Sequence, residues 1–200
     1  DYRSGFGYDI YAQKVDANGN ILWQLDGIVI CSAVNEQSFQ QIISDGIGGA
    51  IIIWQDKRSG TFDLYAQRIN QNGNVLWDID GIVVCDEAND QKAPELISDG
   101  LSGAIIVWND NRNAVDWNIY AQRINQNGNK LWTGEGVPVS LETGNQGTPK
   151  ITSDDNNGAI LVWTDYRAGN SDQYAQRINS NGNLLWTLNG VVICTADYNQ

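Results

Sequence analysis

The chain has 200 residues, of which 24 are acidic and 12 are basic, giving a formal net charge of −12. This balance argues against a nucleic-acid partner, because binding to a phosphate backbone needs clustered Lys and Arg side chains. The absence of His removes the commonest general base and the commonest zinc ligand. No run of about 18 apolar residues is present, so we expect no insertion into a membrane. The chain begins with Asp and contains no Met, so we expect a processed product or an excerpt of a longer protein.

One segment, YAQ(K/R)-x-x-x-NGN-x-LW, recurs along the whole chain. Its four copies begin at Tyr11, Tyr65, Tyr120 and Tyr174. A fixed period of roughly 54 residues is typical of a repeat architecture, in which each unit buries its apolar faces against its neighbours. Residues copied into every unit are therefore expected to build the scaffold, and function is expected where the copies differ.

The unit at residues 35–88 shows the elements in chain order. Four short apolar or alternating segments are separated by turns rich in Gly, Asn and Asp, and no amphipathic helical pattern is present. The predicted strands are Phe39–Ser44, Ala50–Trp54, Asp63–Ile69 and Val75–Cys85. Asp80-Gly81 interrupts the fourth segment and predicts a bulge or bend there.

Four antiparallel strands per repeat at this period predict an all-β fold, a β-propeller of four-stranded antiparallel blades. We expect a partial blade at residues 1–34, containing third and fourth strands only, and whole blades at 35–88, 89–143 and 144–197, with 198–200 beginning the next repeat. Either a longer array of six to eight blades or a second subunit would supply the missing strands. We favour the longer array, because open strand edges are avoided.

Several repeated side chains are expected to be structural. The two Trp of each unit predict an inter-blade core, and Cys31, Cys85 and Cys194 are interpreted as buried small apolar residues. The arginines at repeat-equivalent positions predict ion pairs with carboxylates. The expected partners are Asp56, Asp63, Asp110 and Asp165.

The hairpin segment Asn70–Trp77 has the spacing of the Asp-box, S-x-D-x-G-x-x-W. Together with PELISDGLSGAIIVWNDNR at residues 94–112, it resembles the sialidase-like, Asp-box-containing propeller repeats of large secreted surface proteins of the Bacteroidetes type. The resemblance covers the whole chain and implies an extracellular or cell-surface location. Asn replaces Asp at the acidic position, as in Asn72, so we expect a turn and no metal or cofactor. Asp16–Asn20 has the character of a calcium loop but lacks a distal Glu, and we interpret it as a turn as well.

The loop between the second and third strands varies most among the units. Tyr8, Phe62 and Trp117 occupy one position there, each followed by a carboxylate or amide side chain. Aromatic rings beside such groups can stack on and hydrogen-bond a sugar or peptide. The predicted ligand-binding residues are Trp117, Phe62, Tyr8, Asp63 and Asn118. The alternative is that these aromatic residues only cover the blade edge.

No unit breaks the repeat to create a pair of carboxylates that could flank a glycosidic bond, and we therefore expect no enzyme. The leading prediction is a non-catalytic secreted or surface module for adhesion to a glycan or a protein. One alternative is a rigid spacer or assembly unit of a large extracellular protein. Another is a fragment of a glycoside hydrolase whose catalytic residues lie outside these residues.

Overall fold

The computed structural model describes residues 1–3, 5 and 7–195, and these residues form four antiparallel sheets. The first sheet has two strands, β1 (Ile10–Ala12) and β2 (Ile28–Cys31). The second sheet has β3 (Gln37–Ser44), β4 (Ala50–Asp56), β5 (Asp63–Ile69) and β6 (Ile82–Cys85). The third has β7 (Gln91–Ser98), β8 (Ala104–Asp110), β9 (Asn118–Ile124) and β10 (Val137–Ser140). The fourth has β11 (Gln146–Ser153), β12 (Ala159–Asp165), β13 (Asp172–Ile178) and β14 (Val191–Cys194).

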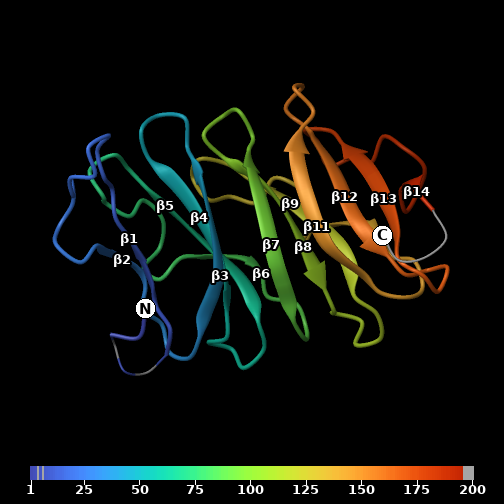
Figure 1. Ribbon diagram of the computed structural model, residues 1–200, viewed down its shortest axis with the longest axis horizontal. Coiled ribbons are helices and arrows are strands. Elements are labelled where there is room, and N and C mark those ends of the chain that lie inside the picture. The colour runs from blue at the N-terminus through green and yellow to red at the C-terminus, as the bar shows by residue number, and fades with distance from the viewer. Residues whose placement is uncertain (4, 6, 196–200) are drawn as a thin grey trace.

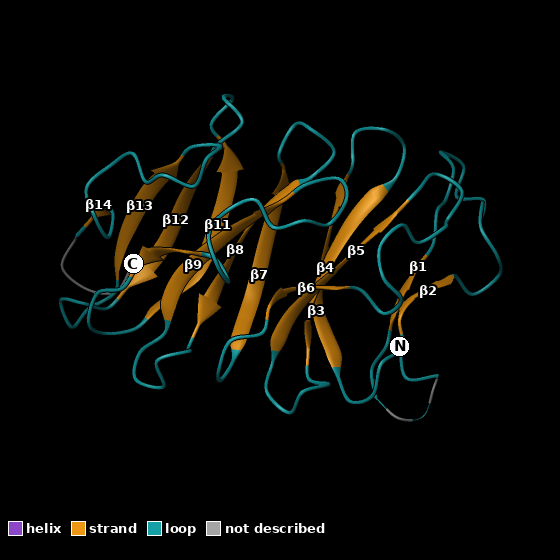
Figure 2. Cartoon of the chain, turned by 180° about the vertical axis from the view of Figure 1, so that it is seen from behind, coloured by secondary structure: helices purple, strands orange, loops and turns teal. Residues whose placement is uncertain are grey.

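The sheets stand side by side in chain order, with the two-stranded sheet at one end of the row and β11–β14 at the other (Figures 1 and 2). The first strands of consecutive full sheets, β3, β7 and β11, contact one another along one side of the row. The prediction of an all-β fold with four-stranded antiparallel sheets is confirmed. Within the described residues the blades form an open row and not a closed propeller. The repeat expected to begin at residue 198 lies outside these residues.

Two local features depart from the predicted strands. The first strand of each full sheet contains a bulge, in the second sheet between Ser38 and Gln41, where Phe39 has a φ of 52°. The fourth predicted strand is shorter than expected, because Val75 makes only an isolated bridge to Ile69 and the ladder begins again at β6. The predicted bend is present: Gly81 has a φ of 90°, and a Cβ there would lie 2.5 Å from the Trp54 ring.

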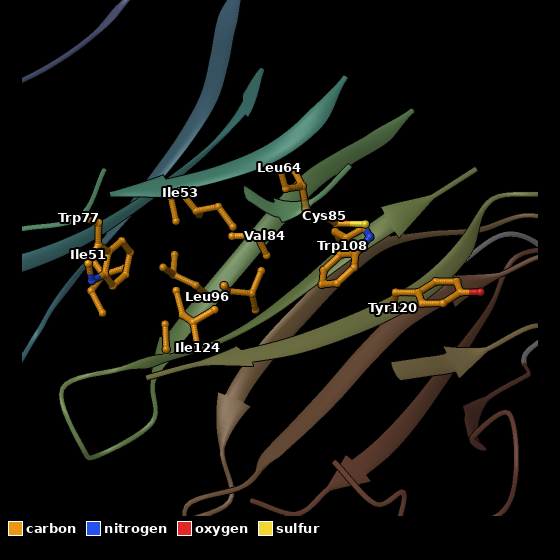
Figure 3. Close-up of a cluster of buried hydrophobic side chains, with 13 residues drawn as sticks. Ile51, Ile53, Leu64, Trp77, Val84, Cys85, Leu96, Trp108, Tyr120 and Ile124 are labelled. Carbon is orange, nitrogen blue, oxygen red and sulfur yellow. The ribbon is translucent and has the colours of Figure 1, made fainter. Parts of the chain in front are cut away.

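The core lies in the seams between sheets, because alternate residues of each strand face opposite neighbours. Ile51 and Ile53 of β4 pack toward the third sheet, whereas Ile52 and Trp54 pack toward the first. The seam between the second and third sheets contains a continuous cluster of buried side chains from both (Figure 3). This burial explains why a central strand reads as an unbroken apolar run, and it ties each sheet to its neighbours.

The second-strand Trp of each full sheet belongs to a repeated polar network. The Trp54 side chain is fully buried, and its indole N–H donates to Asp56 Oδ2 at 2.9 Å. Asp56 also binds Arg58 Nη2 at 2.5 Å, and the guanidinium lies 3.8 Å from the centre of the Tyr65 ring. The same arrangement recurs in the third and fourth sheets around Asp110 and Asp165. The predicted ion pairs are confirmed for these three carboxylates.

The prediction is wrong for Asp63, which accepts a hydrogen bond from Ser59 Oγ at 2.6 Å and has no Arg partner among the described residues. Asp63 is the cross-strand partner of Asp56, and Arg58 is already bound by Asp56. The second set of arginines instead pairs with the carboxylate that closes the first hairpin turn. Arg68 binds Asp45 at 2.9 Å, while Asp45 Oδ1 accepts the Gly49 N–H at 2.8 Å. Equivalent pairs join Arg123 to Asp99 and Arg177 to Asp154.

The Asn-Gly-Asn turn between the third strand and the Trp segment is closed by its first residue. Asn70 Oδ1 accepts the N–H groups of Asn72 and Asn74 at 2.9 and 3.0 Å. The other units use Asp16, Asn125 and Asn179 in the same way. The predicted turn is therefore present.

Cys31 and Cys85 are buried and unpaired, as predicted. Burial raises the pKa of both thiols to about 12. Cys194, in the last sheet, is half-buried.

Candidate functional site

An open groove of about 560 Å³ crosses the seams of the second, third and fourth sheets. Its walls combine aromatic rings with amide side chains, as ligand sites commonly do. The lining consists of Phe39, Gln55, Phe62, Lys92, Ala93, Asn109, Trp117, Asn145, Gln146, Gly147, Thr148 and Tyr166. No Asp or Glu is among these described lining residues. Two of the predicted ligand-binding residues, Phe62 and Trp117, lie in it together.

The backbones of both aromatic residues are held by the following sheet. The Phe62 carbonyl accepts the Gln91 N–H at 2.6 Å, and its N–H donates to Asp90 Oδ1 at 3.0 Å. The Trp117 carbonyl accepts the Gln146 N–H at 2.7 Å. The rings therefore stand on backbone fixed at both seams, and little ordering of these loops is needed when a ligand binds.

Lys92 places a cation between the two rings. Its ammonium lies 4.7 Å from the Phe62 ring centre and 5.7 Å from that of Trp117. Asp90 Oδ2 accepts a hydrogen bond from the same ammonium at 2.6 Å. Partial burial opposes the ionised form of Asp90, but Lys92 and the Phe62 N–H outweigh burial and lower its pKa. The groove therefore contains a hydrogen-bond donor whose charge is already balanced.

The three first-strand bulges contribute to the lining of the groove. Phe39, Ala93 and Thr148 occupy equivalent positions with φ values of 52°, 52° and 48°. Such a backbone costs about 1 to 3 kcal/mol at each non-glycine residue, and strain of this kind concentrates at functional sites. Gln55 Oε1 accepts the Ala93 N–H at 2.8 Å across the seam. Asn109 holds the equivalent position in the third sheet, and its buried Oδ1 has no partner among the described residues.

The remaining predicted site residues lie elsewhere. Tyr8 lines a separate pocket at the two-stranded sheet and packs edge-on against Tyr2. Asp63 and Asn118 are buried at the starts of β5 and β9 and do not line the groove. Burial raises the pKa of Asp63, while Asn118 donates to the Asp116 carbonyl at 3.0 Å. The prediction placed them beside the rings because they follow them in sequence, but successive residues of a strand point to opposite faces.

Sequence reasoning missed Lys92, Asn109, Phe39 and Tyr166, which reach the groove from other strands or loops. All four positions differ in residue type between units, and that variation is the signal that could have identified them. Among the described residues, no group of three or more His, Cys, Asp or Glu side chains is arranged to hold a metal ion. The described part of the chain also has no helical segment with the length and apolar character that a bilayer crossing requires.

Neither the known protein-family models nor the curated proteins include a match to this chain. Among solved structures, the chain is similar to the endo-arabinase from Bacteroides thetaiotaomicron VPI-5482, with 12% sequence identity and a TM-score of 0.46. The match covers 80% of this chain and 61% of the endo-arabinase chain, so the chain spans less than two thirds of that protein. The expectation that the chain is not an enzyme is contradicted by this comparison, because the similar structure is that of an enzyme, and we withdraw it.

Proposed function

We propose that the chain binds neutral glycan in the groove between Phe62 and Trp117. The observation that supports this most directly is the placement of two aromatic rings, from adjacent seams, around one charge-balanced ammonium. Aromatic faces provide large apolar contact area for the C–H face of a sugar ring. The repeats resemble those of secreted surface proteins, which supports an extracellular location for such a module.

The polar groups of the groove match the hydroxyl groups of a sugar. Asn109 Oδ1 is a buried acceptor without a partner in the described part of the chain, and a ligand hydroxyl that donates to it would remove the cost of leaving it unpaired. Lys92 is the cross-strand partner of Asn109 and supplies a donor beside it. Because Asp90 already neutralises that ammonium, an additional carboxylate on the ligand has no free cation to meet, and neutral sugars are favoured over uronic acids.

A second candidate is that the groove is a substrate subsite of a glycoside hydrolase. The lining favours a binding subsite because it has aromatic rings and amides but no Asp or Glu among the described residues. Glycoside hydrolysis generally requires two carboxyl groups about 5 to 9 Å apart across the scissile bond. In this proposal those groups come from other parts of the protein, and the groove positions the sugar chain.

A glycan array followed by calorimetry tests the first proposal. We expect neutral oligosaccharides to bind, and Trp117→Ala and Phe62→Ala each to weaken binding by about 10- to 30-fold, the loss of roughly 1.4 to 2 kcal/mol of contact. Tyr8→Ala is the matched control, because Tyr8 has the equivalent repeat position but lies outside the groove. Binding that survives both groove substitutions would refute the site. An absence of binding to any glycan would instead favour the spacer alternative.

Release of reducing ends from arabinose-containing and other neutral polysaccharides tests the second candidate. Release by the wild-type chain that falls in Trp117→Ala would support a hydrolytic subsite. Binding of a glycan without release of reducing ends would support the groove as a binding site. It would count against hydrolysis by this chain alone.

A further inference from the structure

The seams between sheets repeat one contact at the Asn-Gly-Asn turn. The indole N–H of Trp77 donates to the Gln126 carbonyl of the next sheet at 3.1 Å, and Trp132 donates to the Ser180 carbonyl at 3.0 Å. The Gly of the receiving turn lies directly under the ring, since a Cβ on Gly182 would be 2.8 Å from Trp132. Each turn therefore presents a glycine and a carbonyl to the Trp of the preceding sheet.

An arginine strengthens the same contact. Arg68 Nη1 donates to the Gln126 carbonyl at 2.9 Å, and Arg123 Nη1 donates to the Ser180 carbonyl at 3.0 Å. The side chains of Arg68 and Arg123 are only 7% and 8% exposed. One carbonyl on each receiving turn thus accepts two donors, and both donors are buried in the seam.

Among the described residues no further sheet packs on the outer face of the fourth sheet, and the equivalent donors are more exposed there. Trp186 is 38% exposed, whereas the equivalent Trp77 and Trp132 are 9% and 5% exposed. The Arg177 side chain is 34% exposed. Ile193 is 57% exposed, whereas the equivalent Val84 and Val139 are 0% and 1% exposed. These side chains form what we call the tail face.

The first sheet presents the complementary half of the contact. Gly19 has a φ of 83°, and a Cβ there would meet nothing within 4 Å. Val15 is 56% exposed, whereas the equivalent Ile69 and Ile124 are 1% and 0% exposed. By repeat position, the Ala17 carbonyl corresponds to the carbonyls that accept Trp and Arg elsewhere. These groups form what we call the head face.

We propose that the tail face of one molecule docks the head face of a second copy of this chain. In the contact Trp186 lies on Gly19, and both Trp186 Nε1 and Arg177 Nη1 donate to the Ala17 carbonyl. Such a head-to-tail interface joins different surfaces of the two copies, and it builds a ring or an open chain according to the rotation between them.

The contact is expected to be weaker than an internal seam. Gln173 occupies a position that is a fully buried Leu64 or Ile119 in the preceding sheets, and it bonds Thr164 Oγ1 at 3.2 Å. The head face also belongs to a sheet of only two strands. Association should therefore depend on concentration over an experimentally accessible range.

Sedimentation velocity of the 200-residue chain over a concentration series tests the proposal. We expect the wild type to associate reversibly, and Trp186→Ala and Gly19→Val each to weaken association by roughly 30-fold or more, as expected for truncation or blocking at the centre of an interface. Leu188→Ala is the matched control. Leu188 is 75% exposed, and the equivalent Ile79 is 86% exposed although its sheet has neighbours on both sides, so the position lies off the seams. Circular dichroism confirms that each variant is folded.

Mixing the two variants separates this interface from any symmetric one. Trp186→Ala retains a working head and Gly19→Val retains a working tail, so an equimolar mixture should form a heterodimer that neither variant forms alone. A wild type that remains monomeric throughout the series would overturn the second copy as the occupant of the tail face. Association that is unchanged in both variants, or a mixture that stays monomeric while the wild type associates, would overturn the proposed contact.

Discussion

The contribution of Trp packing on a turn Gly to stability can be measured by making the same Gly→Ala substitution in the first and in the fourth sheet. Gly182 and Gly19 occupy equivalent turns with φ values of 84° and 83°. Replacing either with Ala costs about 1 to 2 kcal/mol, because an L-residue is strained at this φ. Only at Gly182 does the new methyl group also meet Trp132, at 2.8 Å, where the indole is held by its bond to Ser180.

The additional cost at Gly182 is therefore the cost of displacing the ring. Overpacking typically costs about 1 to 3 kcal/mol, so Gly182→Ala should be less stable than Gly19→Ala by that amount. For a chain of this size the excess lowers Tm by roughly 2 to 12 °C relative to Gly19→Ala. Thermal unfolding followed by circular dichroism, at a concentration where the wild type is monomeric, gives the comparison. Equal Tm values for the two variants would show that the turn is not clamped by the preceding sheet.

Three further predictions concern other parts of the molecule. Because burial raises the pKa of Cys31 and Cys85 to about 12 and the thiolate is the reactive form, neither should be alkylated by iodoacetamide at pH 8 until denaturant is added, as mass spectrometry will show. Burial opposes ionisation of Asp45, but the turn N–H groups and Arg68 outweigh it and lower its pKa. The stability that Asp45 contributes is thus complete above about pH 4 and is lost as the pH falls through the lowered pKa. Asp45→Asn should lower the urea midpoint at pH 7 and should make the midpoint depend less on pH in the acid range. An unchanged midpoint at pH 7 would show that the pair of Asp45 and Arg68 contributes no stability. Asn109→Gln should weaken glycan binding about 3- to 10-fold without lowering Tm, because the longer side chain can satisfy its own carbonyl at the neighbouring bulge; unchanged affinity in calorimetry would exclude that carbonyl as a ligand contact.

The repeated scaffold could be predicted because its signals are local and occur in every unit. The alternation of Ile51, Ile52 and Ile53 between two seams follows from their position in a strand buried on both faces. The first-strand bulges could not be predicted, since Phe39 and Thr148 are residues that rarely adopt a positive φ. The same conformation recurs at Ala93, so it belongs to the repeated backbone and not to one residue type.

The candidate site could be predicted only in part, for a related reason. Phe62 and Trp117 were found because they vary at one repeat position, and the variation needs no knowledge of the seams. Lys92 reaches the same groove from the following sheet, and its contact with both rings depends on how the sheets are stacked. A sequence reveals which positions differ, but it does not reveal which of those positions face each other across a seam.

The position occupied by Gln55, Asn109 and Thr164 shows how a repeat creates a single site. Gln55 reaches the N–H of the next bulge and is satisfied. Thr164 bonds the hydroxyl of Thr148 within its own sheet at 3.0 Å. Asn109 is one methylene shorter than Gln55, and its buried carbonyl in the groove that Trp117 also lines has no partner within residues 1–3, 5 and 7–195. An unpaired buried acceptor destabilises the free protein, and a ligand that donates to it recovers that energy on binding. Of these three equivalent positions, only the middle one therefore offers a ligand a buried acceptor in a groove with an aromatic ring, so the three full sheets that the structure describes share one groove of this kind instead of having one each.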